Sequence, residues 1–188
     1  MARTDPPGKG WFAVDGMQVG DRTLEEQLTG LDQLLDDAEG ATVLDLGCAE
    51  GLISLEMMRR GAILVHGVES VASRVKAAEF FFEGLNARFF LDNCERFATD
   101  PPGDLLASYD VVLMLSIAQK MQDPAAFITA AAKRSTGMVA LRLPAPIIND
   151  PRSGFVPVDV PNLMRRLGFP VLMQSPGSRG EWVGIFYR

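Results

Sequence analysis

Cysteine and histidine are scarce in this 188-residue chain, which has two cysteines, Cys48 and Cys94, and one histidine, His66. Two cysteines are too few for a disulfide framework, and their separation does not match the paired spacing of a zinc site. We therefore expect reduced, half-buried thiols and no bound metal.

Long hydrophobic runs are also missing. No stretch reaches the roughly 18 uninterrupted apolar residues that a membrane span needs. The first residues, Met-Ala-Arg-Thr-Asp-Pro-Pro, lack the apolar centre of a secretion signal. The sequence therefore predicts a cytoplasmic protein without a membrane partner.

An excess of positive charge is absent as well. The chain has 18 lysines and arginines against 24 acidic residues, and its net charge is −6. A protein that wraps nucleic acid needs a concentrated basic face, so this balance does not favour a nucleic-acid partner, although it does not exclude one. The hydrophobic content of 47% and the length suit one globular domain with its own core.

Apolar runs alternate with helix-like patterns along the chain, which predicts βαβ units and a parallel sheet. A first amphipathic helix is expected over 23–38, because Thr23 and Glu26 have capping-box spacing and leucines follow at steps of three and four. The other expected helices are 52–60, 71–82, 125–133 and a short one from Asp159 to Gly168. The expected strands are 42–46, 63–68, 87–91, 110–115, 138–143, 170–174 and 182–187.

The last two strands are joined only by Ser-Pro-Gly-Ser-Arg-Gly, too short a connection for a parallel crossover, so they should be antiparallel. Residues 22–188 are expected to form a single domain. Residues 1–21, with the isolated pair Trp11-Phe12, predict an irregular arm that could cover a site. The segment 144–157 is rich in proline and is a candidate flap.

The segment 43–51 is the most informative one, because it joins an expected strand to an expected helix. Small residues at 47, 49 and 51 let the backbone approach a ligand, and the following helix offers free N–H groups. Asp45 stands just before this loop, where a carboxylate would repel a pyrophosphate but suits a cation. Glu69 lies roughly 20 residues beyond the loop, where an acid accepts hydrogen bonds from ribose hydroxyls. The two acids predict a ligand that combines a ribose with a positively charged amino acid.

The stretch Asp45-Leu46-Gly47-Cys48-Ala49-Glu50-Gly51 resembles the first motif of the class I S-adenosylmethionine-dependent methyltransferases, acid-x-Gly-x-Gly/Ala-x-Gly. Four further segments are similar to that family in order and spacing: 66–70, 91–93, 109–116 and Asp123-Pro124. The resemblance covers residues 22–188. It implies an α/β Rossmann-like three-layer sandwich, whose mostly parallel seven-stranded sheet ends in an antiparallel strand pair.

The resemblance also implies S-adenosylmethionine as the cofactor. The small residues of the loop would line its methionine part, Glu69 would hold the ribose, and Asp92 with Asn93 would face the adenine. Ser116 and Ile117 would border the methyl group. The full cofactor-binding set expected from the resemblance is Asp45, Gly47, Cys48, Ala49, Gly51, Glu69, Ser70, Asp92, Asn93, Ser116 and Ile117.

The catalytic residues stay unassigned. Relatives that methylate weakly acidic hydroxyls often carry Ser-x-x-His-His-x-x-Asp-Pro after the fourth strand, and Gln119 and Lys120 stand at the histidine positions here. Lys120 could orient an anionic acceptor or act as a base if desolvated, or it could be a solvated lysine. His66 could be catalytic or a buried strand histidine. Because the donor is already activated, orientation of the two reactants can supply much of the rate.

Three functions follow from these residues. The first is a methyltransferase that acts by proximity and orientation on an oxygen or nitrogen of an unidentified small-molecule or macromolecular acceptor. The second is a non-catalytic S-adenosylmethionine-binding module that regulates or scaffolds a partner. It is suggested by Gln119-Lys120 and by the shortness of the segments, 1–21 and 144–157, that could cover a substrate. A homodimer or a partner subunit could complete such a site. The third, a nicotinamide-dependent oxidoreductase, is disfavoured by Asp45 and by the terminal strand pair.

Overall fold

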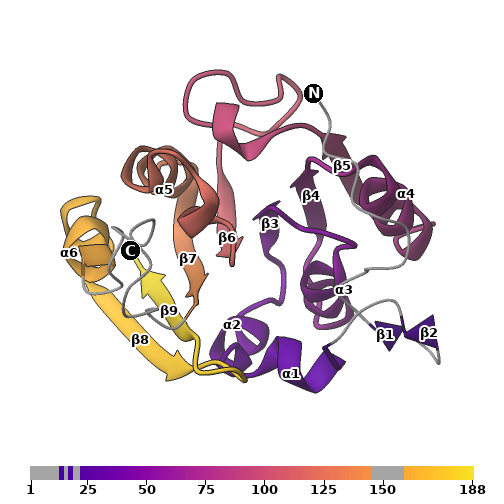
Figure 1. Ribbon diagram of the computed structural model, residues 1–188, viewed down its shortest axis with the longest axis horizontal. Coiled ribbons are helices and arrows are strands. Elements are labelled where there is room, and N and C mark those ends of the chain that lie inside the picture. Colours follow the sequence, from indigo (N-terminus) through magenta and orange to yellow (C-terminus); the bar gives the residue numbers. More distant parts are fainter. Residues whose placement is uncertain (1–12, 15–16, 19–21, 145–158) are drawn as a thin grey trace.

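The computed structural model describes residues 13–14, 17–18, 22–144 and 159–188 (Figure 1). Seven strands form one sheet in the order β5-β4-β3-β6-β7-β9-β8. The strands are β3 (Thr42–Leu46), β4 (Leu64–Glu69), β5 (Ala87–Leu91), β6 (Tyr109–Leu115), β7 (Ser135–Leu143), β8 (Val171–Pro176) and β9 (Trp182–Tyr187).

The first five strands of the sheet order are parallel, whereas β9 is antiparallel to both of its neighbours. The predicted fold class, including the antiparallel C-terminal pair, is therefore confirmed. The chain runs from β3 outward to β5 and then returns to place β6 on the other side of β3. At such a switch point the connections leave in opposite directions, which opens a crevice at the carboxyl ends of the strands.

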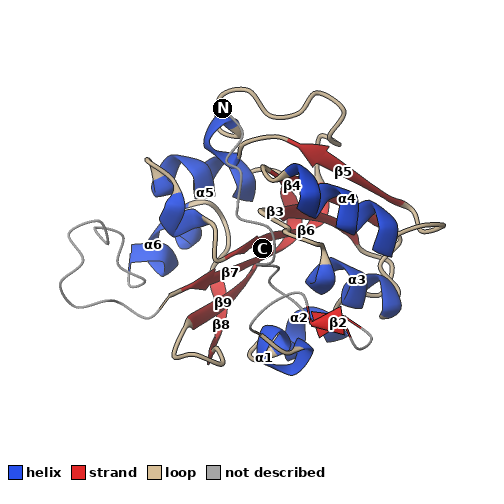
Figure 2. Ribbon diagram, turned by 45° about the vertical axis from the view of Figure 1, so that its right-hand side comes forward, coloured by secondary structure: helices blue, strands red, loops and turns tan. Residues whose placement is uncertain are grey.

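Helices cover both faces of the sheet and make the three layers seen in Figure 2. On one face the core contains side chains of α2, α3 and α4, and on the other it contains side chains of α5 and α6. The strand β6 has apolar residues on both faces, with Leu113 in one core and Val112 in the other, which explains its unbroken apolar sequence. The helices are α1 (Leu24–Leu28), α2 (Asp32–Asp36), α3 (Leu52–Arg59), α4 (Ala72–Phe81), α5 (Pro124–Ala132) and α6 (Asp159–Arg166), with short 3₁₀ turns η1 (Cys94–Arg96) and η2 (Ala118–Lys120).

The prediction of one continuous helix over 23–38 is wrong. The chain forms two short helices, although the capping box of Thr23 and Glu26 is present. The interruption falls at Gly30, which has a left-handed φ of +82°. A Cβ atom at this position would lie 3.0 Å from the carbonyl oxygen of Pro176, so the break lets the chain pass closely under the end of β8.

The sequence predicts an irregular N-terminal arm. The structure differs, because β1 (Ala13–Val14) and β2 (Met17–Gln18) form a short antiparallel pair. Trp11, Phe12 and all of the candidate flap except Pro144 lie outside the described residues. Their covering roles, and the division into an arm and a domain, remain predictions. Within the described ranges, no helix is long and apolar enough to cross a membrane.

Candidate functional site

The glycine loop leaves β3 and enters α3 at the switch point. Gly47 and Gly51 have left-handed φ angles of +76° and +78°, and Ala49 has a positive φ of +51°. The N–H of Gly47 donates to the carbonyl oxygen of Val68 at 2.8 Å, which fixes the loop against the end of β4. A Cβ atom on Gly47 would lie 2.9 Å from the side chain of Ile117, so this position has no room for a larger residue.

Glu69 closes the other side of the loop from the end of β4. Its Oε2 atom accepts a hydrogen bond from the N–H of Ala49 at 3.1 Å. Its Oε1 atom accepts from the N–H groups of Ser70 and Val71 at 2.8 and 2.9 Å, at the start of α4. The carboxylate therefore ties the glycine loop to the neighbouring strand-to-helix turn.

Asp45 is the buried acid beneath the loop, only 4% exposed. Burial raises the pKa of its carboxyl group to about 6, a hydrogen bond from Ser54 opposes the rise, and the charge of Glu69 adds to it. The Ser54 hydroxyl donates to Oδ2 at 2.7 Å. The other carboxylate oxygen has no hydrogen-bond partner among the described side chains and backbone. The site thus holds an acid whose charge is incompletely compensated.

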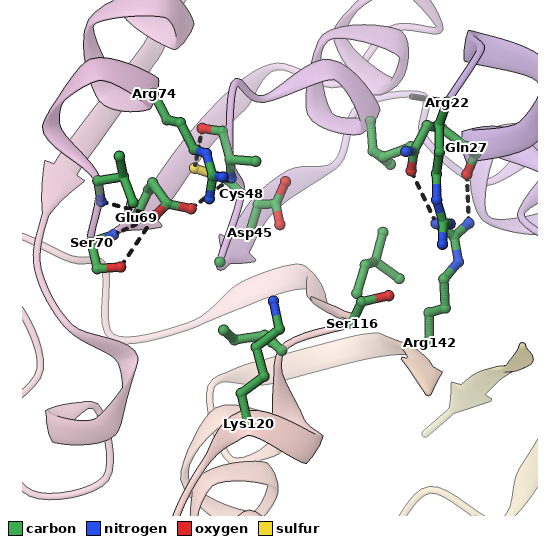
Figure 3. Close-up of a pocket in the computed structure, with 16 residues that line it drawn as sticks. Arg22, Gln27, Asp45, Cys48, Glu69, Ser70, Arg74, Ser116, Lys120 and Arg142 are labelled. Atoms are coloured by element: carbon green, nitrogen blue, oxygen red, sulfur yellow. Dashed lines mark hydrogen bonds between the residues drawn. The ribbon is translucent and has the colours of Figure 1, made fainter. Parts of the chain in front are cut away.

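Two adjoining pockets open at this edge of the sheet, with volumes of about 310 and 550 Å³. Both are bordered by Gly47, Glu69, Ser70, Ile117 and Lys120, so they form one cleft. The smaller pocket contains Asp45 (Figure 3), and the larger one contains Asp92 and Asn93.

The expected cofactor-binding residues meet in this cleft with one exception. Asp45, Cys48, Ala49 and Ser116 line the smaller pocket, and the residues common to both pockets complete the set with Asp92 and Asn93. Gly51 lines neither pocket. It is the N-cap residue of α3, where a Cβ atom would lie 3.0 Å from the Phe82 ring, so it faces the core instead.

Asp92 and Asn93 also stabilise the turn after β5. Asp92 Oδ1 accepts from the N–H of Asn93 at 2.7 Å. Asn93 Oδ1 accepts from the N–H of Glu95 at 3.0 Å and caps η1. These side chains therefore combine a local turn role with a position in the larger pocket.

Of the three candidate catalytic residues, the structure brings only Lys120 to the cleft. Gln119 and His66 line neither pocket. His66 is buried in β4, where its Nδ1 lies 2.7 Å from the hydroxyl oxygen of Tyr109. That hydroxyl oxygen also accepts a hydrogen bond from the N–H of Leu106 at 2.9 Å. Burial lowers the pKa of His66, which favours the neutral ring.

Sequence reasoning missed four polar residues of the smaller pocket. They are Arg22, Gln27, Arg74 and Arg142. Arg142 is the only charged residue in the apolar end of β7 and is 2% exposed. A charge inside such a buried run is a signal that could have identified it. The other three come from helices or from the residues just before α1, and no local pattern distinguishes them from surface residues.

Cys48 and Cys94 are both free thiols, and they are buried rather than half-buried. Burial raises the pKa of Cys94 to about 12, and it raises the pKa of Cys48 as well. Thiols with raised pKa values are poor nucleophiles and poor metal ligands. In the part of the chain that the structure describes, no group of three or more His, Cys, Asp or Glu residues could hold a metal ion.

Comparison with known proteins agrees with this geometry. The family model of a methyltransferase domain matches residues 21–172. The chain is 30% identical over 123 residues to the ubiquinone biosynthesis O-methyltransferase of Xanthomonas oryzae pv. oryzae, a match that covers 65% of this chain and 50% of that protein. The chain thus spans about half the length of the curated relatives it matches.

Two solved structures share the fold at low sequence identity. An S-adenosylmethionine-dependent methyltransferase from Mesorhizobium loti superposes with a TM-score of 0.69 at 13% identity, over 84% of this chain and 95% of that one. The magnesium protoporphyrin IX methyltransferase of Synechocystis, with bound S-adenosylmethionine, gives a TM-score of 0.64 at 18% identity, over 87% and 79%. Because the family model matches most of the sequence and the sheet has the same architecture, the chain belongs to the class I S-adenosylmethionine-dependent methyltransferases.

Proposed function

We propose that this chain transfers the methyl group of S-adenosylmethionine to an oxygen or nitrogen atom of an acceptor bound in the same cleft. The observation that carries the proposal is the buried carboxylate of Asp45, which borders a pocket shared with Glu69 and the glycine loop. A buried acid without a full set of partners is costly unless a cationic ligand compensates it.

The residues of the cleft fit the donor part by part. Asp45 would pair with the ammonium group of its methionine part, beside the closely approaching backbone of Gly47 and Ala49. Oε2 of Glu69 accepts a hydrogen bond from the loop and keeps acceptor capacity for a ribose hydroxyl. Asp92 and Asn93 would face the adenine in the larger pocket. The volume of that pocket, about 550 Å³, suits a nucleoside.

When bound, S-adenosylmethionine supplies a sulfonium carbon already activated for in-line displacement. The task left for the chain is to hold that carbon and the acceptor atom in line and to exclude water. Ser116 and Ile117 follow β6 at the wall of the cleft, so they are the residues proposed to flank the methyl group. Ser116 lines the smaller pocket with a left-handed φ of +61°, which is unusual for a residue other than glycine.

Lys120 is the candidate polar group on the acceptor side. It borders both pockets, and in Figure 3 its side chain extends toward the cleft from the wall opposite Asp45. Lys120 is exposed, whereas a lysine that acts as a general base must be desolvated, so we assign it an orienting role for the acceptor.

Incubation with radiolabelled donor and cell extract tests the proposal. Label transferred to any acceptor by the wild-type protein, and not by Asp45→Asn, supports it. Tight donor binding without transfer across broad extracts would instead support the regulatory or scaffold module.

Free thiols at Cys48 and Cys94 suit a reducing compartment, so we propose that the activity is cytoplasmic.

A further inference from the structure

Two arginines lie at one end of the smaller pocket. In Figure 3, Arg22 and Arg142 stand at one end, Glu69 and Arg74 stand at the other, and Asp45 lies between them. Arg142 projects from the carboxyl end of β7, and Arg22 precedes α1. The two guanidinium groups are close enough for the charge of Arg22 to lower the pKa of Arg142, in addition to the larger effect of burial.

Positive charge exceeds negative charge around these two arginines. Arg22 makes a two-point ion pair with Glu181, with distances of 2.9 and 3.2 Å. Arg142 donates instead to the side-chain and backbone oxygens of Gln27, and its Nε atom lies 4.0 Å from Glu181, beyond hydrogen-bonding range. Two guanidinium groups therefore share one carboxylate.

Both guanidinium groups also have unused donors. The Nε atoms of Arg22 and Arg142 are buried and have no hydrogen-bond partner within the described parts of the chain. Arg142 is 2% exposed, so water has little access to this donor. A buried donor without a partner costs free energy. Guanidinium stays protonated in proteins and matches the geometry of a carboxylate. A buried excess of positive charge on two residues that line a pocket is suited to an anionic ligand.

The charges of the donor's methionine part have other candidate partners in the cleft. Its methionine carboxylate can be received by the first turn of α3, where Ile53 borders the same pocket and the N–H groups of the first turn have no partner inside the helix. Asp45 compensates the ammonium group. With both charges of the methionine part met in this way, Arg22 and Arg142 are left for a second anion.

We propose that Arg22 and Arg142 bind a carboxylate group of the methyl acceptor, which makes the acceptor of this chain an anionic small molecule. The inference rests on the proposed function and names its substrate class. Glu181 holds Arg22 in place and limits the positive charge of the subsite, and Gln27 orients Arg142 by receiving two of its donors.

Ligand-observed NMR on the protein saturated with S-adenosylhomocysteine tests the assignment, with benzoate and benzamide as a pair of probes that differ in charge. We expect benzoate to bind and benzamide to bind about tenfold more weakly, the difference expected for a charge-assisted contact. Arg22→Gln and Arg142→Gln should remove the preference, while the affinity for S-adenosylhomocysteine stays within a factor of about two.

Two further variants make the test independent of whether a buried arginine can be replaced. Glu181→Gln removes the competing negative charge and keeps a carbonyl oxygen that can accept a hydrogen bond from Arg22, so benzoate should bind more tightly. Arg179→Gln is the matched control, because Arg179 is exposed in the same turn and does not border the pocket. Tighter benzoate binding by the Glu181→Gln variant and no change in the control support the assignment.

The opposite results distinguish failure of the acceptor assignment from failure of the proposed function. Equal binding of benzoate and benzamide to the product-saturated wild type would overturn the acceptor assignment alone. So would a large loss of product affinity in the arginine variants, because the arginines would then hold the donor's own carboxylate. Failure of the wild type to bind S-adenosylhomocysteine at all would overturn the proposed function, and the acceptor assignment with it.

Discussion

The carboxylate of Glu69 accepts a hydrogen bond from the backbone N–H of Ala49 at 3.1 Å, and both residues line the smaller pocket. The acid expected to hold a ribose therefore also supports the loop that holds the rest of the ligand. Three further hydrogen bonds to its other oxygen, two from Ser70 and one from Val71, anchor it to the start of α4. Substitution at this position should disturb the loop as well as the ligand.

Glu69→Ala is expected to weaken donor binding by about 1 to 3 kcal/mol, because ligand hydroxyls and the Ala49 N–H both lose an acceptor. Glu69→Gln keeps one carbonyl oxygen and should recover part of this loss. Isothermal titration calorimetry with S-adenosylmethionine gives the affinities, and hydrogen exchange at residues 47–52 reports the loop. Equal affinity in the wild type and in both variants would contradict the proposed role.

Asp45→Asn should stabilise the ligand-free protein at neutral pH. A raised pKa means that the folded state binds the proton more tightly than the unfolded state, so the contribution of this group to stability is present below pH 4 and is lost as the pH rises to about 6. The penalty at pH 7 is on the order of 2 to 3 kcal/mol. Asparagine can keep an acceptor for the Ser54 hydroxyl without the charge. Denaturant unfolding at pH 5 and pH 7 measures the effect, and a variant less stable than the wild type at pH 7 would refute it.

The affinity for the donor should rise with pH through the titration of Asp45. The ionised carboxylate pairs with the ammonium group, so below pH 6 each unit of acidification should weaken binding up to about tenfold, and toward pH 7 the affinity should level off. Calorimetric titrations between pH 5 and pH 7, where the ammonium group stays protonated, measure this profile. The Asp45→Asn variant is the control, because its profile should be flat in this range. A profile that falls with increasing pH would be incompatible with the pairing.

The parts of the fold that follow from local pattern were predictable from the sequence. The strand β6 is unbroken and apolar because helices cover both of its faces, and the short link before β9 excludes a parallel crossover. The break at Gly30 was not predictable, because its cause is the close approach of Pro176, which lies far away in the sequence. A regular leucine spacing continues across the break and gives no sign of it.

The candidate site likewise contains some residues that a local motif predicts and others that depend on distant parts of the chain. Asp45, Gly47 and Glu69 lie at strand ends where the βαβ pattern places them, so a local motif sufficed. The ion pair of Arg22 with Glu181 joins residues from opposite ends of the chain, and no spacing rule relates them. His66 and Tyr109, which share a hydrogen bond, likewise lie on different strands, and no spacing rule relates them.

Gly47→Ala and Gly84→Ala form a matched pair that separates backbone strain from crowding. Both glycines have left-handed φ angles, +76° and +80°, so alanine costs about 1 kcal/mol or more of conformational energy at either position. At Gly84 no atom lies within 4 Å of the added Cβ, whereas at Gly47 the side chain of Ile117 lies 2.9 Å away. The Gly84→Ala variant should therefore lose stability without losing donor affinity.

The Gly47→Ala variant should lose both, because Ile117 and the loop must separate at the wall common to both pockets. Thermal unfolding and donor titration of the two variants measure stability and affinity independently. If alanine at position 47 weakened donor binding no more than alanine at position 84, the close contact between the loop and the end of β6 would not be what shapes the donor site.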